Sequence, residues 1–340
     1  MLSRVSQHSL QMPSNVCLVP RPLPNTRLIT AATMDRCPAE IWSYIFSYAC
    51  RDGGSTGCSL SLTSKYIREV SIPVRFTSVA IFGVIKISSF YRLLKRGETG
   101  SITYLFISDD DPSGNNASST LGASPPGGPE PATVMISDIL RSNAATLLSL
   151  SITLSSLSLQ LLPPVDFPLI ADVTLVASGR KETASSVQPL PVILPGFPRL
   201  RRLRLVNIDD GDISDKLFST SPSITHLHIT GHRLAPPLDK LSPTIQSILL
   251  QPVSSLVDID PQSYLRWLRN IMGLMGDTSF WTRITLLRAQ AFHASRCSHE
   301  ARVAWERTKK GDHALWRSGE SASVGELLAQ LLQAEERFLP

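Results

Sequence analysis

The sequence predicts an α/β fold in three parts: a short helical head, an irregular solenoid of strand-and-helix repeats, and a C-terminal helical cap. Three observations support this prediction. Bulky apolar residues with helical spacing occur near residue 40, and an apolar pattern typical of short strands recurs from residue 76 to residue 250. The 25 prolines among 340 residues disfavour an all-helical fold. The predicted boundaries are a disordered tail at 1–33, the head at 34–75, the repeat body at 76–259, and the cap and tail at 260–340.

Composition favours a folded chain that does not cross a membrane. The chain is 42% hydrophobic and 18% charged, with a formal net charge of +5, which is unlike a disordered sequence. The longest apolar run, 79–85, has seven residues, whereas a membrane span needs about 20. Five cysteines without paired spacing fit a reducing compartment, so we expect a cytoplasmic or nuclear protein. Prolines in the basic segment 1–33 favour a disordered tail over a targeting helix.

The head begins with a helix at Pro38, a residue suited to the first helical position. One face of this helix carries four bulky apolar residues: Ile41, Trp42, Ile45 and Phe46. The glycine-rich stretch 52–57 ends the helix, and a second helix follows with Leu60 and Leu62. Ser64 can cap a third helix. Three short helices bury little surface alone, so this head must lean on the body or on a partner.

The head resembles a known protein family. The run Cys37-Pro38-Ala39-Glu40-Ile41-Trp42, followed by Ile45-Phe46 and by 61–76, is similar to an F-box of the type found in F-box-like proteins of basidiomycete fungi. The resemblance is close over 37–71 and elsewhere extends only to general layout; Cys37 replaces the leucine that begins the family's pattern. It implies that the head binds the Skp-type adaptor of an SCF ubiquitin ligase. The implied adaptor contacts are Pro38, Ile41, Trp42, Ile45, Phe46, Leu60 and Leu62. The alternative is that these residues form only the core of a small helical bundle.

After residue 73 the apolar spacing changes to L-x-x-L-x-L, and seven copies follow. Their first positions are Phe76, Ile102, Leu147, Ile170, Leu200, Ile224 and Ile245. The intervals are 26, 45, 23, 30, 24 and 21 residues, mostly within the range of leucine-rich repeats. The long interval contains 109–131, which we interpret as a disordered insertion rich in Pro, Gly, Ser and Asn. Helices are expected between some copies, at 87–94 and 136–140. Proline-rich connectors leave an α/β sandwich as the alternative to a leucine-rich-repeat-like solenoid.

The region after the seventh copy predicts a helical cap. Asp260-Pro261 is a good helix start, and apolar residues at 264–272 share one face that can seal the open end of the solenoid. From residue 281 onward the sequence favours helices, with Trp305 and Trp316 as packing residues.

Three patterns that imitate catalytic or metal sites are better explained as structure. The stretch 53–57 matches G-x-S-x-G, but an amphipathic helix precedes it instead of a buried strand. The run 109–114 begins like a calcium loop, yet Thr120 stands where a glutamate is needed. Near His226, His228 and His232, only Asp239 is available to complete the closed set of four ligands that a structural zinc site needs. We therefore predict no catalytic residue, no metal ligand and no cofactor.

A candidate binding face comes from the repeat positions. Arg202 and Arg204 hold the third and fifth positions of one copy, and His226 and His228 hold the same positions of the next. Such side chains point along the concave face of a leucine-rich repeat, on strands about 5 Å apart. We expect these four residues to bind an acidic or phosphorylated segment of a target protein. The alternative is a solvated strand face. The sequence has no long basic stripe with interleaved aromatic residues, which is the pattern typical of nucleic-acid-binding proteins. We therefore predict no nucleic-acid partner.

Together these features predict a non-enzymatic substrate-recognition subunit of an SCF-type ubiquitin ligase. The head would recruit the adaptor and the body would hold the target. The alternative is a repeat scaffold or protein-interaction module whose head caps the first repeat and never meets an adaptor.

Overall fold

The computed structural model describes residues 37–110, 131–155, 161–178, 195–208, 217–231, 244–251, 283–287 and 294–312, together with residues 316 and 329. The predicted tail at 1–33 and the helix expected at 261–272 lie outside the described residues, as does nearly all of the insertion at 109–131. The head contains three helices: α2 (Ala39–Ala49), α3 (Ser55–Thr63) and α4 (Lys65–Ser71). Ser64 caps α4 as predicted, because its Oγ accepts a hydrogen bond from the Ile67 amide at 3.1 Å.

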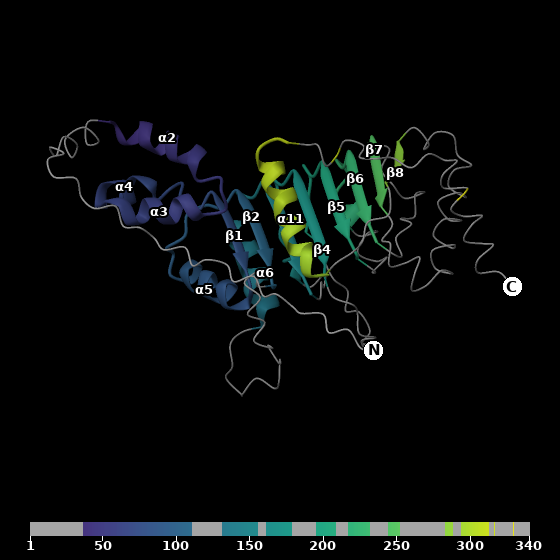
Figure 1. Ribbon diagram of the computed structural model, residues 1–340, viewed down its shortest axis with the longest axis horizontal. Coiled ribbons are helices and arrows are strands. Elements are labelled where there is room, and N and C mark those ends of the chain that lie inside the picture. Colours follow the sequence, from purple (N-terminus) through teal and green to yellow (C-terminus); the bar gives the residue numbers. More distant parts are fainter. Residues whose placement is uncertain are drawn as a thin grey trace, which may run out of the picture.

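The body is built on one parallel eight-stranded sheet whose strands follow each other in sequence order (Figure 1). The strands are β1 (Ser78–Phe82), β2 (Tyr104–Ser108), β3 (Ser149–Leu154), β4 (Asp172–Ala177), β5 (Arg202–Val206), β6 (His226–Thr230), β7 (Ser247–Gln251) and β8 (Ile284–Leu286). The mixed α/β class predicted from the sequence is therefore confirmed.

The register of the sheet follows the apolar pattern of the sequence. The fourth position of each L-x-x-L-x-L copy pairs with the fourth position of the next: Val79, Leu105, Leu150, Val173, Leu203, Leu227 and Ile248. The sixth positions align in the same way. Because side chains alternate between the faces of a strand, the fourth and sixth positions all enter one buried layer. β8 extends the sheet beyond the seven predicted copies, within a region that the sequence indicated as helical.

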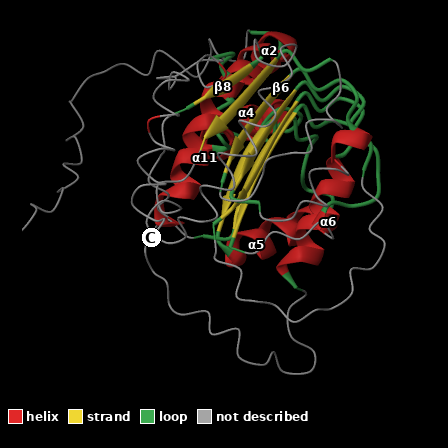
Figure 2. Ribbon diagram, turned by 90° about the vertical axis from the view of Figure 1, so that its right-hand side faces the viewer, coloured by secondary structure: helices red, strands yellow, loops and turns green. Residues whose placement is uncertain are grey.

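Helices cover both faces of the sheet (Figure 2). On one face, α5 (Val84–Lys95) and α6 (Ala132–Asn143) pack over the fourth- and sixth-position side chains, and both match helices expected between the copies. On the other face lies α11 (Ala294–Lys309), which contacts β2, β3 and β4. α11 thus covers the middle of the sheet, a position that the sequence did not indicate; the helix that we expect to seal the open end, at 261–272, lies outside the described residues.

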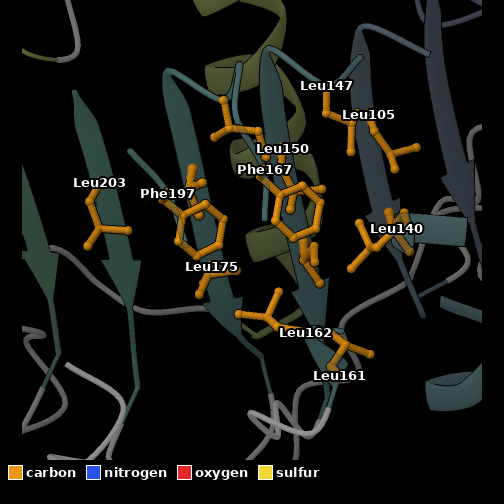
Figure 3. Close-up of a cluster of buried hydrophobic side chains, with 14 of the residues drawn as sticks. Leu105, Leu140, Leu147, Leu150, Leu161, Leu162, Phe167, Leu175, Phe197 and Leu203 are labelled. Carbon is orange, nitrogen blue, oxygen red and sulfur yellow. The ribbon is translucent and has the colours of Figure 1, made fainter. Parts of the chain in front are cut away.

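The main core extends from Val79 of β1 to Leu250 of β7 on the face of the sheet that α5 and α6 cover, and Figure 3 shows a group of its side chains. Beside β3 and β4, aromatic residues from the described parts of the connections fill this layer. Phe167 and Phe197 are fully buried and stack with ring centroids 5.4 Å apart. The segments 161–170 and 195–200, which precede β4 and β5, therefore contribute to the core.

Candidate functional site

Three of the predicted adaptor-contact residues pack inside the head. Phe46 is 5% exposed and forms a small core with Cys50 and Ile67. Trp42 and Leu60 are partly buried against this core, and the Trp42 ring stacks on Phe46 with centroids 5.4 Å apart. These contacts hold α2 against α3 and α4. Burial, aided by the charge of Asp52, raises the pKa of the Cys50 thiol to about 11, so Cys50 is not a reactive nucleophile at neutral pH.

The outer side of α2 carries a stripe of large exposed side chains. Ile41 is 51% exposed and Ile45 is 46% exposed; Tyr44 and Tyr48 are exposed beside them. These four residues, which we call the α2 stripe, have the i, i+3, i+4, i+7 spacing of one helix face. The two tyrosine rings meet edge to face at 5.1 Å. Tyr44 and Tyr48 were missed in the sequence analysis, although this spacing already indicates them.

The remaining predicted adaptor contacts are also on the surface. Pro38 is exposed immediately before α2, and Leu62 on α3 is 81% exposed. The structure therefore places Pro38, Ile41, Ile45 and Leu62 where a partner can reach them.

The glycine-rich stretch of the head begins α3 and attaches the head to the sheet. The Asp52 carboxylate accepts hydrogen bonds from the Gly54 amide at 3.2 Å and the Thr56 amide at 2.8 Å, and Ser55 Oγ also donates to it. Burial works against ionisation of Asp52, but these hydrogen bonds hold its pKa below the usual value. The Ala80 amide of β1 donates to the Gly53 carbonyl at 3.0 Å. The head thus pairs with the free edge of the sheet.

The four predicted target-binding residues lie on adjacent strands. Arg202 is opposite His226, and Arg204 is opposite His228. Arg202 is paired with Asp172 of β4: its Nη2 donates to Asp172 Oδ2 at 2.9 Å, and its Nε donates to Oδ1. The sequence analysis did not identify Asp172 as part of this face. Asp172 is nevertheless the third residue of its own copy of the pattern, which is the position that Arg202 holds in the next copy. Its carboxylate reduces the positive charge expected at this face.

His228 is buried and Trp316 lies beside it. The His228 side chain is 4% exposed, and the centroid of the Trp316 ring is 6.2 Å from the ring centroids of both His226 and His228. Burial, together with the charge of Arg204, lowers the pKa of His228 to about 3. His228 is therefore neutral at pH 7 and contributes no charge to this face.

α11 lies on the face of the sheet that carries Arg204 and His228, and it covers β2, β3 and β4. Trp305 and Ala301 pack against Phe106 of β2 and Val176 of β4. Ser298 Oγ donates to Asp110 Oδ2 at 2.6 Å and accepts from Ser108 Oγ at 3.0 Å. The part of this face beyond α11 is formed by β5, β6 and β7.

The patterns that imitated metal sites do not form one in the described part of the chain. Among those residues, no group of three or more histidine, cysteine, aspartate and glutamate side chains can hold a metal ion. Asp109 instead accepts a hydrogen bond from the Ser155 amide at 2.9 Å. His232 and Thr120 lie outside the described residues. Across the described helices, none combines the length and apolar character that a bilayer crossing requires.

No protein-family model matches the chain, and no curated protein or solved structure matches it.

Proposed function

We propose that this protein is the substrate-recognition subunit of an SCF-type ubiquitin ligase in the cytoplasm or nucleus. Its F-box-like head would dock on a Skp-type adaptor, and its leucine-rich-repeat-like body would hold a target protein. The protein performs no covalent chemistry itself. It acts by proximity, because holding both partners raises the effective concentration of the target near the ubiquitin-charged enzyme.

The α2 stripe carries this proposal. A helix whose apolar residues occur only on its buried side needs no partner, but α2 is apolar on both sides. Phe46 faces the core of the head, while Ile41 and Ile45 face solvent. Exposed apolar patches of this kind mark interaction sites on soluble proteins. A helix that presents anchors at i, i+3, i+4 and i+7 fits the helix-in-groove mode of recognition, in which a few large residues provide most of the affinity.

The repeat-body part of the proposal is supported by the strand order and the register. Each strand of the sheet pairs only with its neighbours in sequence, from β1 to β8. Seven copies of the apolar pattern stay in register without a slip. Stacking of repeats that contact only their neighbours is typical of solenoids.

The adaptor experiment is a pull-down with a purified Skp-type adaptor. We expect the wild-type chain to capture the adaptor and the Ile41→Asp, Ile45→Asp variant to lose at least tenfold in capture. Val84→Asp, Ile85→Asp is the matched control, because both residues are exposed apolar side chains on α5, outside the head. Capture by neither the wild type nor the control would contradict the adaptor proposal, as would equal capture by all three proteins.

The target would bind the sheet face beyond α11 through an acidic or phosphorylated segment. Arg202, Arg204, His226 and His228 lie on this face; Arg202 is paired with Asp172 and His228 is neutral. We expect acidic and phosphorylated peptides to bind wild type more tightly than the Arg202→Glu, Arg204→Glu variant. Fluorescence anisotropy at two salt concentrations measures this difference. Equal binding would exclude an acidic target at this face.

A second candidate function, a repeat scaffold that binds no adaptor, is favoured by one observation. The head closes the free edge of β1 through the hydrogen bond between Ala80 and Gly53, and the Gly53 amide donates to Ser78 Oγ at 3.2 Å. Capping an exposed edge strand is a sufficient structural reason for a head. The pull-down distinguishes the two functions, because a scaffold of this kind captures no adaptor.

A further inference from the structure

A cavity of about 580 Å³ lies at the junction between the head and the body. It is lined by α3 from the head, and by β1 and α5 from the body, which lie next to each other in Figure 1. The volume falls within the range of small-molecule binding sites in proteins. Neither the α2 stripe nor the sheet face beyond α11 contributes to this cavity.

The inner wall of the cavity is apolar and well packed. Phe76, Val79, Ile81 and Phe90 line it. The rings of Phe76 and Phe90 meet edge to face with centroids 6.3 Å apart. These residues also belong to or pack against the main core, so this wall is part of a rigid layer. An apolar ligand body that lies on this wall is removed from water without rearrangement of the core.

Two cationic residues, Arg75 and Lys86, and one acidic residue, Glu98, line the same cavity, so its charged lining residues carry a net positive charge. The Arg75 guanidinium lies 4.7 Å from the centroid of the Phe76 ring, and Arg75 Nη2 donates to the Glu98 backbone carbonyl at 3.0 Å. Because an apolar wall strengthens the attraction between opposite charges, an anionic group beside Arg75 and Lys86 is favoured.

The glycines of the head let backbone segments approach closely at this cavity. A Cβ at Gly57 would lie 2.3 Å from the Arg75 carbonyl oxygen, so no larger residue fits where α3 meets the segment before β1. Gly53 and Gly54 have positive φ angles of 85° and 105°. All three glycines line the cavity. The G-x-S-x-G pattern is thereby explained as a close approach of backbone segments at the cavity wall.

We propose that this cavity binds an amphipathic anion: a carboxylate with an unbranched apolar body. The carboxylate pairs with the positive charges of the Arg75 guanidinium and the Lys86 ammonium. The apolar body lies on Phe76, Val79 and Phe90. Such a ligand contacts both the head and the body, and it therefore stabilises their packing. Adaptor binding is not needed for this proposal.

The first test is calorimetric titration of the full chain with dodecanoate below its micelle concentration. We expect saturable binding of one dodecanoate per chain, and binding at least tenfold weaker for dodecan-1-ol and for dodecyltrimethylammonium. Arg75→Gln should weaken dodecanoate binding at least tenfold. Arg92→Gln is the matched control, because Arg92 lies on α5 and does not line the cavity. Absence of saturable dodecanoate binding to the wild type would overturn the proposal, as would equal affinities of wild type and Arg75→Gln.

The second test keeps the proposal falsifiable if Arg75→Gln does not fold. Ser89 lies exposed on α5 and lines the cavity, so Ser89→Trp fills it from the outside; Ile85→Trp on the same helix is the control. Cys58 is an exposed thiol that lines the cavity, and Cys37 does not line it. We expect dodecanoate to slow maleimide labelling of Cys58 and to leave labelling of Cys37 unchanged. The Ser89→Trp variant should lose this protection of Cys58, and the Ile85→Trp variant should keep it. Equal labelling of Cys58 with and without dodecanoate would overturn the proposal.

Discussion

The Nζ of Lys309 donates a hydrogen bond to the backbone carbonyl of Arg51 at 2.6 Å and a second to Ser78 Oγ at 3.1 Å. The same Nζ lies 3.6 Å from the centroid of the Trp305 ring. The end of α11 is therefore joined both to the loop that follows α2 and to the first strand of the sheet. The C-terminal helix holds the head on the body, although 258 residues separate Arg51 from Lys309 in the sequence.

Lys309 makes the stability of the protein depend on pH in the alkaline range. Burial lowers its pKa from 10.5 to about 8, against the opposing charges of Glu306 and Asp52. Between pH 8 and 10.5 the unfolded chain binds more protons at this site than the folded chain, so the free energy of unfolding rises with pH. Relative to Lys309→Met, we expect wild type to gain stability from pH 8 to pH 10, measured by urea denaturation.

The control for this prediction is the range below pH 7, where Lys309 is protonated in the folded and the unfolded chain. There we expect the stability difference between wild type and Lys309→Met to be constant. A difference that stays constant from pH 8 to pH 10 as well would show that the Lys309 ammonium is not buried in solution.

Gly57 packs against the backbone of Arg75 so closely that there is no space for a side chain. A Cβ at this residue would lie 2.3 Å from the Arg75 carbonyl oxygen, so Gly57→Ala must displace α3 from the segment before β1. We expect a loss of about 1–3 kcal/mol in the free energy of unfolding, as for other overpacked sites. Ser59→Ala, at an exposed position of the same helix, should change stability by less than about 0.5 kcal/mol. Chemical denaturation that finds Gly57→Ala as stable as wild type would refute this close approach.

The rings of Phe167 and Phe197 stack on each other (Figure 3). They come from two connections between strands and lie on the face of the sheet that α5 and α6 cover. Both rings are fully buried, and their planes are 10° apart. We expect a double-mutant cycle with Phe167→Leu and Phe197→Leu to give a coupling energy of about 0.5–1.5 kcal/mol. Phe106→Leu, on the opposite face of the sheet, should show no coupling with Phe167→Leu. A coupling energy of zero for the stacked pair would mean that each ring packs independently.

The repeat pattern predicted the sheet because each copy carries its own signal. Val79 and Leu105 pair across adjacent strands since both hold the fourth position of a copy, and a register slip of one residue would expose every apolar side chain. The head helices were predictable for a similar reason. Ser64 caps α4, and the spacing of Ile41, Ile45 and Phe46 is helical.

The position of α11 could not be predicted, because it depends on contacts between distant segments. Its polar sequence gives no indication that Trp305 packs against Phe106, or that Lys309 reaches Arg51. β8 is three residues long, and its pairing with β7 is likewise a tertiary effect.

The positive charge predicted for the candidate target face was too high for a different reason. Asp172 holds the third position of its own copy and so lies beside Arg202 in the repeat alignment, where its carboxylate offsets the charge of the arginine.

His228 makes stability depend on pH in the acid range. Its pKa is lowered from 6.5 to about 3, first by burial and then by the charge of Arg204. Between pH 3 and 6.5 the unfolded chain binds the proton more tightly, so the free energy of unfolding falls as the pH is lowered through this window. Relative to His228→Gln, we expect wild type to lose up to about 1.4 kcal/mol per pH unit between pH 5.5 and 4.5 and to be constant above pH 7.5. NMR titration of the His228 ring checks the pKa directly. Arg204→Gln removes one of the two causes and should raise that pKa, whereas a His228 ring that titrates near pH 6.5 in the wild type would show that it is exposed to water.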